Sequence, residues 1–105
     1  AAHAGLDAYI RKNAQAGAYM AAICAAPTVY GEKGLLTGKK ATCYPGMEQG
    51  LVGAEVLYDK VVVDGRWITS RGLGTAIDFG LKLVEILKNQ PLADAIAEKI
   101  VYDRA

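Results

Sequence analysis

One cysteine stands at the end of an apolar run and directly before small residues and a proline, a placement that suits a nucleophile. Residues 18–23 read Ala-Tyr-Met-Ala-Ala-Ile, Cys24 follows, and Ala25, Ala26 and Pro27 come next. An apolar run without polar alternation is typical of a strand covered on both faces, and proline is favoured in the first turn of a helix. The spacing predicts a nucleophile elbow, a tight strand-to-helix turn that presents the thiol at the carboxyl edge of a sheet.

Such an elbow favours the reactive form of Cys24. Unpaired N–H groups and the dipole at a helix N-terminus stabilise an anion, here the thiolate. The amide of Ala25 is placed to hold a developing oxyanion. The local pattern leaves a second interpretation open, in which Cys24 is a small buried hydrophobic residue, because alanines replace the glycines of a Gly-x-Ser-x-Gly elbow.

Three further residues, Tyr44, Cys43 and Arg71, are candidates for the wall of a pocket around Cys24. Tyr44 offers a hydroxyl that donates to a substrate oxygen, or it is simply a pocket wall. A redox pair between Cys43 and Cys24 requires Cα atoms within about 7 Å, and the favoured alternative for Cys43 is a buried structural thiol. Arg71 is expected to contact an anion or a dimer partner, and the favoured alternative is a solvated or ion-paired turn residue.

Hydrophobic periodicity and turn residues predict the elements that position these side chains. Asp64-Gly65 predicts a type I′ hairpin turn, and Thr75 with Asp78 matches a capping box. The order of elements predicts an α/β fold with a mostly parallel sheet and helices on its faces. Helices are expected at 5–16, about 26–33, 75–89 and 91–100, and strands at 18–23, 40–44, 58–63 and 66–69.

Length and composition limit the class of protein. The 105 residues, 52% hydrophobic and 22% charged, predict one folded domain. A net charge of +1 with scattered basic residues argues against nucleic acid or a membrane as partner, and no apolar run approaches the about 20 residues that cross a bilayer. Two cysteines without a secretory signal favour the cytoplasm. The single histidine, His3, is expected at the surface, and no zinc-ligand spacing is present, so no metal site is expected.

Two separated segments resemble signatures of the ThiJ/PfpI superfamily, in the branch of the parkinsonism-associated deglycase. Residues 21–28, Ala-Ala-Ile-Cys-Ala-Ala-Pro-Thr, are similar to the elbow of that family, and residues 69–79, Thr-Ser-Arg-Gly-Leu-Gly-Thr-Ala-Ile-Asp-Phe, to its second signature. The resemblance covers nearly the whole chain. It implies a flavodoxin-like three-layer α/β/α sandwich of the class I glutamine amidotransferase type, a homodimer, and a functional Cys24.

The resemblance also implies that residues 1–105 form a single but partial α/β domain, the C-terminal part of the family unit. The family's first strands are then expected upstream or in a separate N-terminal chain of the same protein. Those strands carry an acidic residue that hydrogen-bonds the cysteine and a Gly-Gly loop that donates an oxyanion amide.

The function that the resemblance implies is cofactor-free attack of Cys24 on a small aldehyde or dicarbonyl such as methylglyoxal, as in a glyoxalase III-type or deglycase-type hydrolyase. One alternative is a non-enzymatic oxidative-stress sensor or chaperone that works through oxidation of the same cysteine. Another is an intracellular peptidase-like relative. The peptidase is disfavoured because Ala25 stands where that branch has a histidine; Tyr44 likewise replaces a histidine of several relatives, so no local Cys–His dyad exists.

Overall fold

A three-stranded sheet organises the molecule. The computed structural model describes residues 4–100 and 102, so the expectation for His3 lies outside the described residues. Strand β1 (Met20–Ile23) runs parallel to β5 (Trp67–Ser70), and β4 (Val61–Asp64) pairs with β5 in the antiparallel direction. The order is therefore β1-β5-β4, and the predicted combination of a parallel pair with a hairpin is confirmed.

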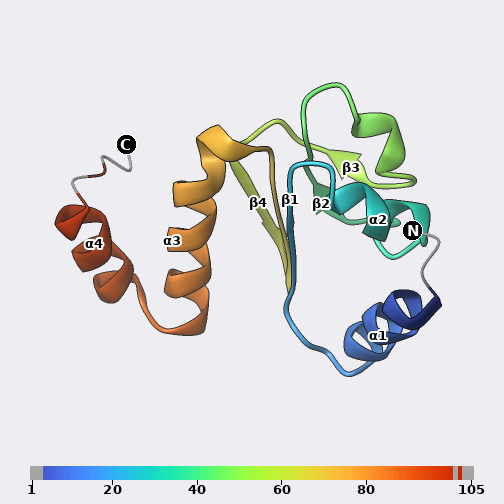
Figure 1. The fold of residues 1–105 in the computed structure, drawn as a ribbon, viewed down its shortest axis with the longest axis horizontal. Helices are drawn as coiled ribbons and strands as arrows, with labels where there is room; N and C mark the ends of the chain where they lie inside the picture. Colours follow the sequence, from blue (N-terminus) through green and yellow to red (C-terminus); the bar gives the residue numbers. More distant parts are fainter. Residues whose placement is uncertain (1–3, 101, 103–105) are drawn as a thin grey trace.

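Helices lie on both sides of this sheet, which gives the layered α/β arrangement predicted from the sequence (Figure 1). On one side lie α1 (Ala4–Gln15) and α2 (Pro27–Glu32), and on the other lie α3 (Ala76–Leu87) and α4 (Gln90–Lys99). Helix α4 packs mainly against α3. The side chain of Asn89 caps α4 by accepting a hydrogen bond from the Leu92 N–H at 2.8 Å.

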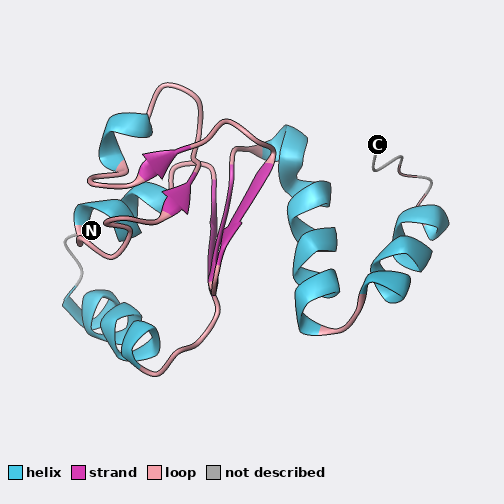
Figure 2. Ribbon diagram, turned by 180° about the vertical axis from the view of Figure 1, so that it is seen from behind, coloured by secondary structure: helices cyan, strands magenta, loops and turns pink. Residues whose placement is uncertain are grey.

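A second, two-stranded sheet lies beside α2 (Figure 2). It consists of β2 (Lys40–Ala41) and β3 (Glu55–Val56), which run parallel. The strand predicted at 40–44 is therefore shorter than expected, because the Thr42 N–H donates to the Thr69 hydroxyl at 2.9 Å instead of to a neighbouring strand. A 3-10 helix, Glu48–Gly50, occupies the glycine-rich segment between these strands.

The main core lies between the three-stranded sheet and the layer formed by α1, α2 and the small sheet. The ring of Tyr30 packs edge-on against Trp67, with ring centroids 5.4 Å apart. Burial of these apolar side chains removes them from water and holds β1 in place. The buried members of this cluster are Ile10, Ala14, Met20, Leu36, Ala41, Cys43, Leu51 and Trp67.

Strand β1 is an edge strand of the described sheet. Met20 and Ala22 are buried, whereas Ala21 is exposed and Ile23 is half-buried. The prediction of a strand covered on both faces is therefore wrong for the described part of the chain. Within that part β1 pairs only with β5, so its second edge is open.

Two local turn predictions are also wrong. Asp64 pairs with Trp67, so the two-residue connection is Gly65-Arg66, and only Gly65 has a positive φ. A type I′ turn needs positive φ at both positions, whereas glycine at the first position is the pattern of type II′. The capping box does not form either. The Thr75 hydroxyl accepts hydrogen bonds from the Arg71 and Gly72 N–H groups and donates to the Gly72 carbonyl, so it makes no hydrogen bond to the first turn of α3.

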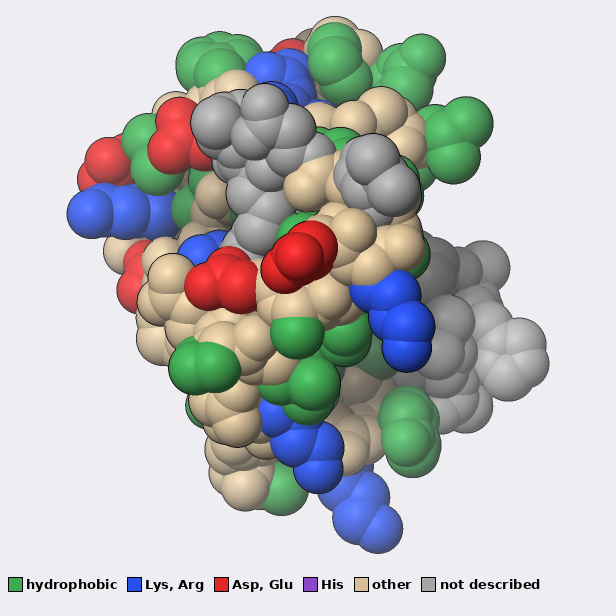
Figure 3. All heavy atoms as spheres, turned by 90° about the vertical axis from the view of Figure 1, so that its left-hand side faces the viewer, with side chains coloured by type: hydrophobic (Ala, Val, Ile, Leu, Met, Phe, Trp, Pro, Cys, Tyr) green, Lys and Arg blue, Asp and Glu red, His purple; other side chains and the backbone are tan. Residues whose placement is uncertain are grey.

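The surface of α3 and α4 carries both signs of charge with hydrophobic side chains between them (Figure 3). Among the described helices, none has the length and hydrophobicity needed to span a membrane. The described residues also contain no cluster of three or more His, Cys, Asp or Glu side chains suited to a metal ion.

Candidate functional site

Cys24 occupies a strained backbone conformation directly after β1. Its φ is 64°, and it is the one non-glycine residue with a positive φ in the described chain. This left-handed conformation costs an L-residue about 1–2 kcal/mol, and such strain concentrates at functional positions. Pro27 then begins α2, so the structure contains the tight strand-to-helix turn that the sequence predicts.

Hydrogen bonds fix the carbonyl groups of this turn. The Ile23 carbonyl accepts from the Ala26 N–H (3.2 Å), that of Cys24 from the Tyr44 N–H (2.7 Å), and that of Ala25 from the Thr28 N–H (3.0 Å) and hydroxyl (2.6 Å). The Ala25 N–H, in contrast, donates to no acceptor in the described chain. Helix α2 has only six residues, so its dipole is small. The Ala25 N–H is therefore the better candidate for stabilising a negative charge at this turn.

Tyr44 and Arg71 line a shared surface depression of about 480 Å³, together with Pro45 and residues 72–75. Tyr44 is 52% exposed, and its ring lies against Gly72, where an added Cβ would approach it to 3.7 Å. Cys24 is not among the residues that line this depression. The connection between the two features is the backbone hydrogen bond from Tyr44 to Cys24.

The structure places Cys43 in the core, in agreement with the favoured alternative of a buried structural thiol and not with a place on the pocket wall. Its side chain is fully buried, and its thiol lies 3.5 Å from the Tyr44 carbonyl oxygen, to which it donates. Both cysteines are free thiols. Burial raises the pKa of the Cys43 thiol, the Glu48 carboxylate raises it further, and Arg71 opposes them. These surroundings favour the neutral, unreactive form of Cys43.

Arg71 is ion-paired and mostly buried, which is one of the alternatives that the sequence left open. Its Nη2 donates to Glu48 at 3.1 Å, its Nη1 to the Tyr58 carbonyl at 3.3 Å, and its Nε to the Cys43 carbonyl at 3.2 Å. The guanidinium also lies 5.1 Å from the centre of the Tyr58 ring. Neither Glu48 nor Tyr58 was identified from the sequence, because they lie 23 and 13 positions away from Arg71 and belong to no local motif.

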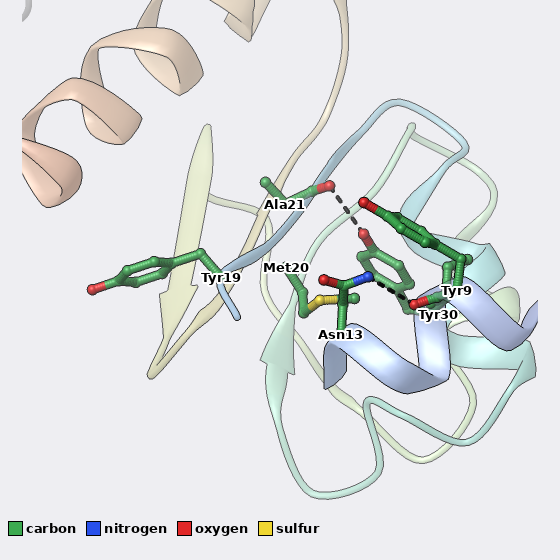
Figure 4. Close-up of a pocket in the computed structure, with 7 residues that line it drawn as sticks. Tyr9, Asn13, Tyr19, Met20, Ala21 and Tyr30 are labelled. Atoms are coloured by element: carbon green, nitrogen blue, oxygen red, sulfur yellow. Dashed lines mark hydrogen bonds between the residues drawn. The ribbon is translucent and has the colours of Figure 1, made fainter. Parts of the chain in front are cut away.

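A second cavity, of about 370 Å³, lies between α1, β1 and α2 (Figure 4). The Tyr30 hydroxyl donates to the Ala21 carbonyl at 3.2 Å, and burial raises the pKa of Tyr30. Tyr19 points away from these two residues. The Met20 N–H bonds to the Arg66 carbonyl beside β5, so the Ala21 carbonyl faces the open edge of β1. This cavity therefore follows the unpaired strand edge, and Cys24 is not among its lining residues.

The strain at Cys24 predicts a difference between two substitutions. Cys24→Gly is expected to be more stable than Cys24→Ala by about 1 kcal/mol, because glycine adopts positive φ without the steric cost that alanine has. Both variants lack the thiol, so the comparison isolates the backbone. Urea unfolding measures the difference in free energy of unfolding between the two variants. A glycine variant less stable than the alanine variant would contradict a strained turn.

The chain belongs to the DJ-1/PfpI family, whose model matches residues 1–86. It is 43% identical over 94 residues to the protein dj-1beta of Drosophila melanogaster, covering 88% of this chain and 50% of that protein. It is 32% identical over 93 residues to a glutathione-independent glyoxalase of Caenorhabditis elegans, covering 87% and 50%. It is 35% identical over 80 residues to a deglycase of Pyrococcus horikoshii, covering 74% and 48%.

Solved structures of the family have the same fold. A cysteine-to-alanine mutant of a DJ-1 superfamily protein from Salmonella typhimurium superposes with a TM-score of 0.91 at 30% identity, covering 98% of this chain and 57% of that one. Oxidized DJ-1 of Toxoplasma gondii superposes with a TM-score of 0.87 at 37% identity, covering 94% and 54%. The predicted flavodoxin-like fold is thus confirmed, and the chain spans about half the length of these relatives.

Proposed function

We propose that the protein converts small reactive dicarbonyls to hydroxy acids without a cofactor, with Cys24 as the nucleophile. The observation that carries this proposal is the positive φ of Cys24 at the end of β1, directly before an Ala25 N–H that has no acceptor in the described chain. The names of the glyoxalase and the deglycase among the relatives support the substrate class.

The chemistry with methylglyoxal balances without an outside oxidant. The thiolate attacks the aldehyde carbon, an S–C bond forms, and the carbonyl electrons move to an oxygen that the Ala25 N–H stabilises. Transfer of the proton from that carbon to its neighbour, through an enediol, gives a thioester. Water then cleaves the thioester and releases lactate and the thiolate, so methylglyoxal plus water equals lactic acid.

The proton transfers need an acid–base group that the described elbow does not supply. The resemblance implies an acidic residue and a second oxyanion amide in the part of the family unit that lies outside the matched half. We propose that this part adds its strands to the open edge of β1, where Tyr30 now binds the Ala21 carbonyl. Parallel α/β sheets are normally continuous and covered, which supports this position.

Lactate formation tests the proposed function. The full-length protein, dialysed against a chelator and mixed with methylglyoxal, is expected to form lactate, followed by proton NMR. Because the reaction needs only water, no nicotinamide or glutathione is added. Absence of lactate above a protein-free control would overturn the proposal.

A second candidate, a redox sensor, uses the same cysteine. Cys24 is half-buried rather than sealed, and the relative from Toxoplasma gondii was solved in an oxidized form. An amide that holds an oxyanion would also hold a sulfinate oxygen. Dilute peroxide followed by mass spectrometry distinguishes the candidates: two oxygens confined to Cys24, in a protein that forms no lactate, would favour the sensor.

A further inference from the structure

We propose that Arg71 is a positioning residue that orients and polarises the oxyanion donor Ala25 N–H through two successive peptide groups. This inference deepens the proposed function and rests on it. Arg71 itself lies in the neighbouring depression and belongs to a different segment of the chain from the elbow. Within the described residues, hydrogen bonds through the Cys43–Tyr44 peptide connect the two.

The first peptide group joins Cys43 to Tyr44. Its carbonyl oxygen accepts a hydrogen bond from the Arg71 Nε–H at 3.2 Å. Its N–H, on the opposite side of the same planar unit, donates to the Cys24 carbonyl at 2.7 Å. Because the peptide is planar, the guanidinium that holds one side also sets the direction of the other.

The second peptide group joins Cys24 to Ala25. Its carbonyl receives the hydrogen bond from Tyr44, and its N–H is the donor that has no acceptor in the described chain. A series therefore runs from the guanidinium to peptide 43–44, to peptide 24–25, and ends at the Ala25 N–H. Hydrogen bonds in such a series polarise one another, by roughly 10–30% per bond. A positive charge at the start makes the final N–H a stronger donor.

Glu48 and Tyr58 hold the guanidinium in the required orientation. One Glu48 oxygen accepts from Arg71 at 3.1 Å, and the other accepts from the Gly46 N–H at 3.0 Å. The side chains of Arg71 and Glu48 are only 17% and 23% exposed, so solvent screens this pair less than a surface ion pair. With Nη1 and Nη2 engaged, the Nε–H is left to face Cys43. Lysine lacks this geometry because its ammonium is a point donor.

Kinetics of Arg71→Met and Arg71→Lys test the proposal in the full-length protein. We expect kcat for lactate formation to fall about 10–100-fold in both, less than for complete loss of an oxyanion donor, with KM within about threefold. Alkylation of Cys24 by iodoacetamide involves no oxyanion and is expected to change less than threefold. Lys82→Met, which removes the Lys82–Glu85 pair on α3, is the matched control and is expected to keep wild-type kcat.

Chemical rescue distinguishes positioning from general structural support. Methylguanidinium added to Arg71→Ala is expected to restore at least half of the wild-type kcat, since the depression that Arg71 lines opens to solvent and admits a small cation. No rescue, or a kcat that falls only in proportion to lost folded protein in urea titrations, would overturn the proposal.

An NMR measurement separates failure of this inference from failure of the proposed function. If the wild-type protein forms no lactate, the Ala25 and Tyr44 amide protons still report the series of hydrogen bonds. Arg71→Met is expected to shift both amide protons upfield, and Lys82→Met is expected to leave them unchanged. Unmoved amide protons in Arg71→Met would refute the connection whatever the activity.

Discussion

Cys24→Ala is expected to lower the rate of lactate formation from methylglyoxal by at least about 10³-fold, to the background of the protein-free reaction. Loss of a nucleophile removes the covalent route altogether, and in enzymes with covalent catalysis the cost is of this order or larger. Cys24→Ser is expected to be equally inactive, because a hydroxyl of ordinary acidity is far less ionised than a thiol. Steady-state assays at matched protein concentration measure both variants.

A folded but inactive variant is the result that matters. The Cys24 side chain is half-buried and its backbone is fixed by the Tyr44 N–H, which alanine leaves in place. We therefore expect the free energies of unfolding of Cys24→Ala and wild type, measured by urea titration, to agree within about 1 kcal/mol. A Cys24→Ala protein that keeps more than a tenth of the wild-type rate would exclude Cys24 as the nucleophile.

Gly31→Ala is expected to destabilise the protein by about 3 kcal/mol or more, lowering its melting temperature by roughly 10–20 °C. Gly31 lies in α2 where the helix meets the segment of Gly50 and Leu51. A Cβ at Gly31 would stand 2.2 Å from the Gly50 carbonyl oxygen and 2.8 Å from the Leu51 Cα. These are backbone atoms, so no side-chain rotation relieves the clash, and the two segments must separate.

The matched control is another glycine within a helix. Gly80 lies in α3, and a Cβ there meets no atom within 4 Å. Gly80→Ala is expected to be neutral or to stabilise by up to about 1 kcal/mol, because alanine has the higher helix propensity. Thermal unfolding by circular dichroism compares the two variants. Equal melting temperatures for both would show that α2 and the segment of Gly50 are not closely packed.

The packing at Gly31 also connects to the candidate site. Gly50 ends the 3-10 helix that begins with Glu48, the partner of Arg71. A displacement of this short helix therefore moves the carboxylate that orients the guanidinium. We expect any Gly31→Ala protein that remains folded at low temperature to show reduced kcat as well.

Much of the fold could be predicted from the sequence, because the signals are local. The helical spacing of apolar residues predicted α1 and α3 within a few residues, and the hairpin of β4 and β5 followed from two β-rich runs around Gly65. The elbow was also predictable, since an apolar run, small residues and Pro27 are adjacent along the chain. These features depend on backbone propensities and side-chain periodicity within about ten residues.

Other features were decided only by tertiary structure. The ion pair of Arg71 with Glu48 and the hydrogen bond from Tyr44 to Cys24 join residues that are 20 or more positions apart. The place of Cys43 in the core depends on how the layers pack. The Thr75 hydroxyl does not cap α3, because it forms hydrogen bonds with the N–H and carbonyl of Gly72 in the preceding turn. Residue types and spacing along one chain determine which groups are present and which local turns form. The distances between remote backbone groups depend on how the layers pack, and only the folded chain establishes them.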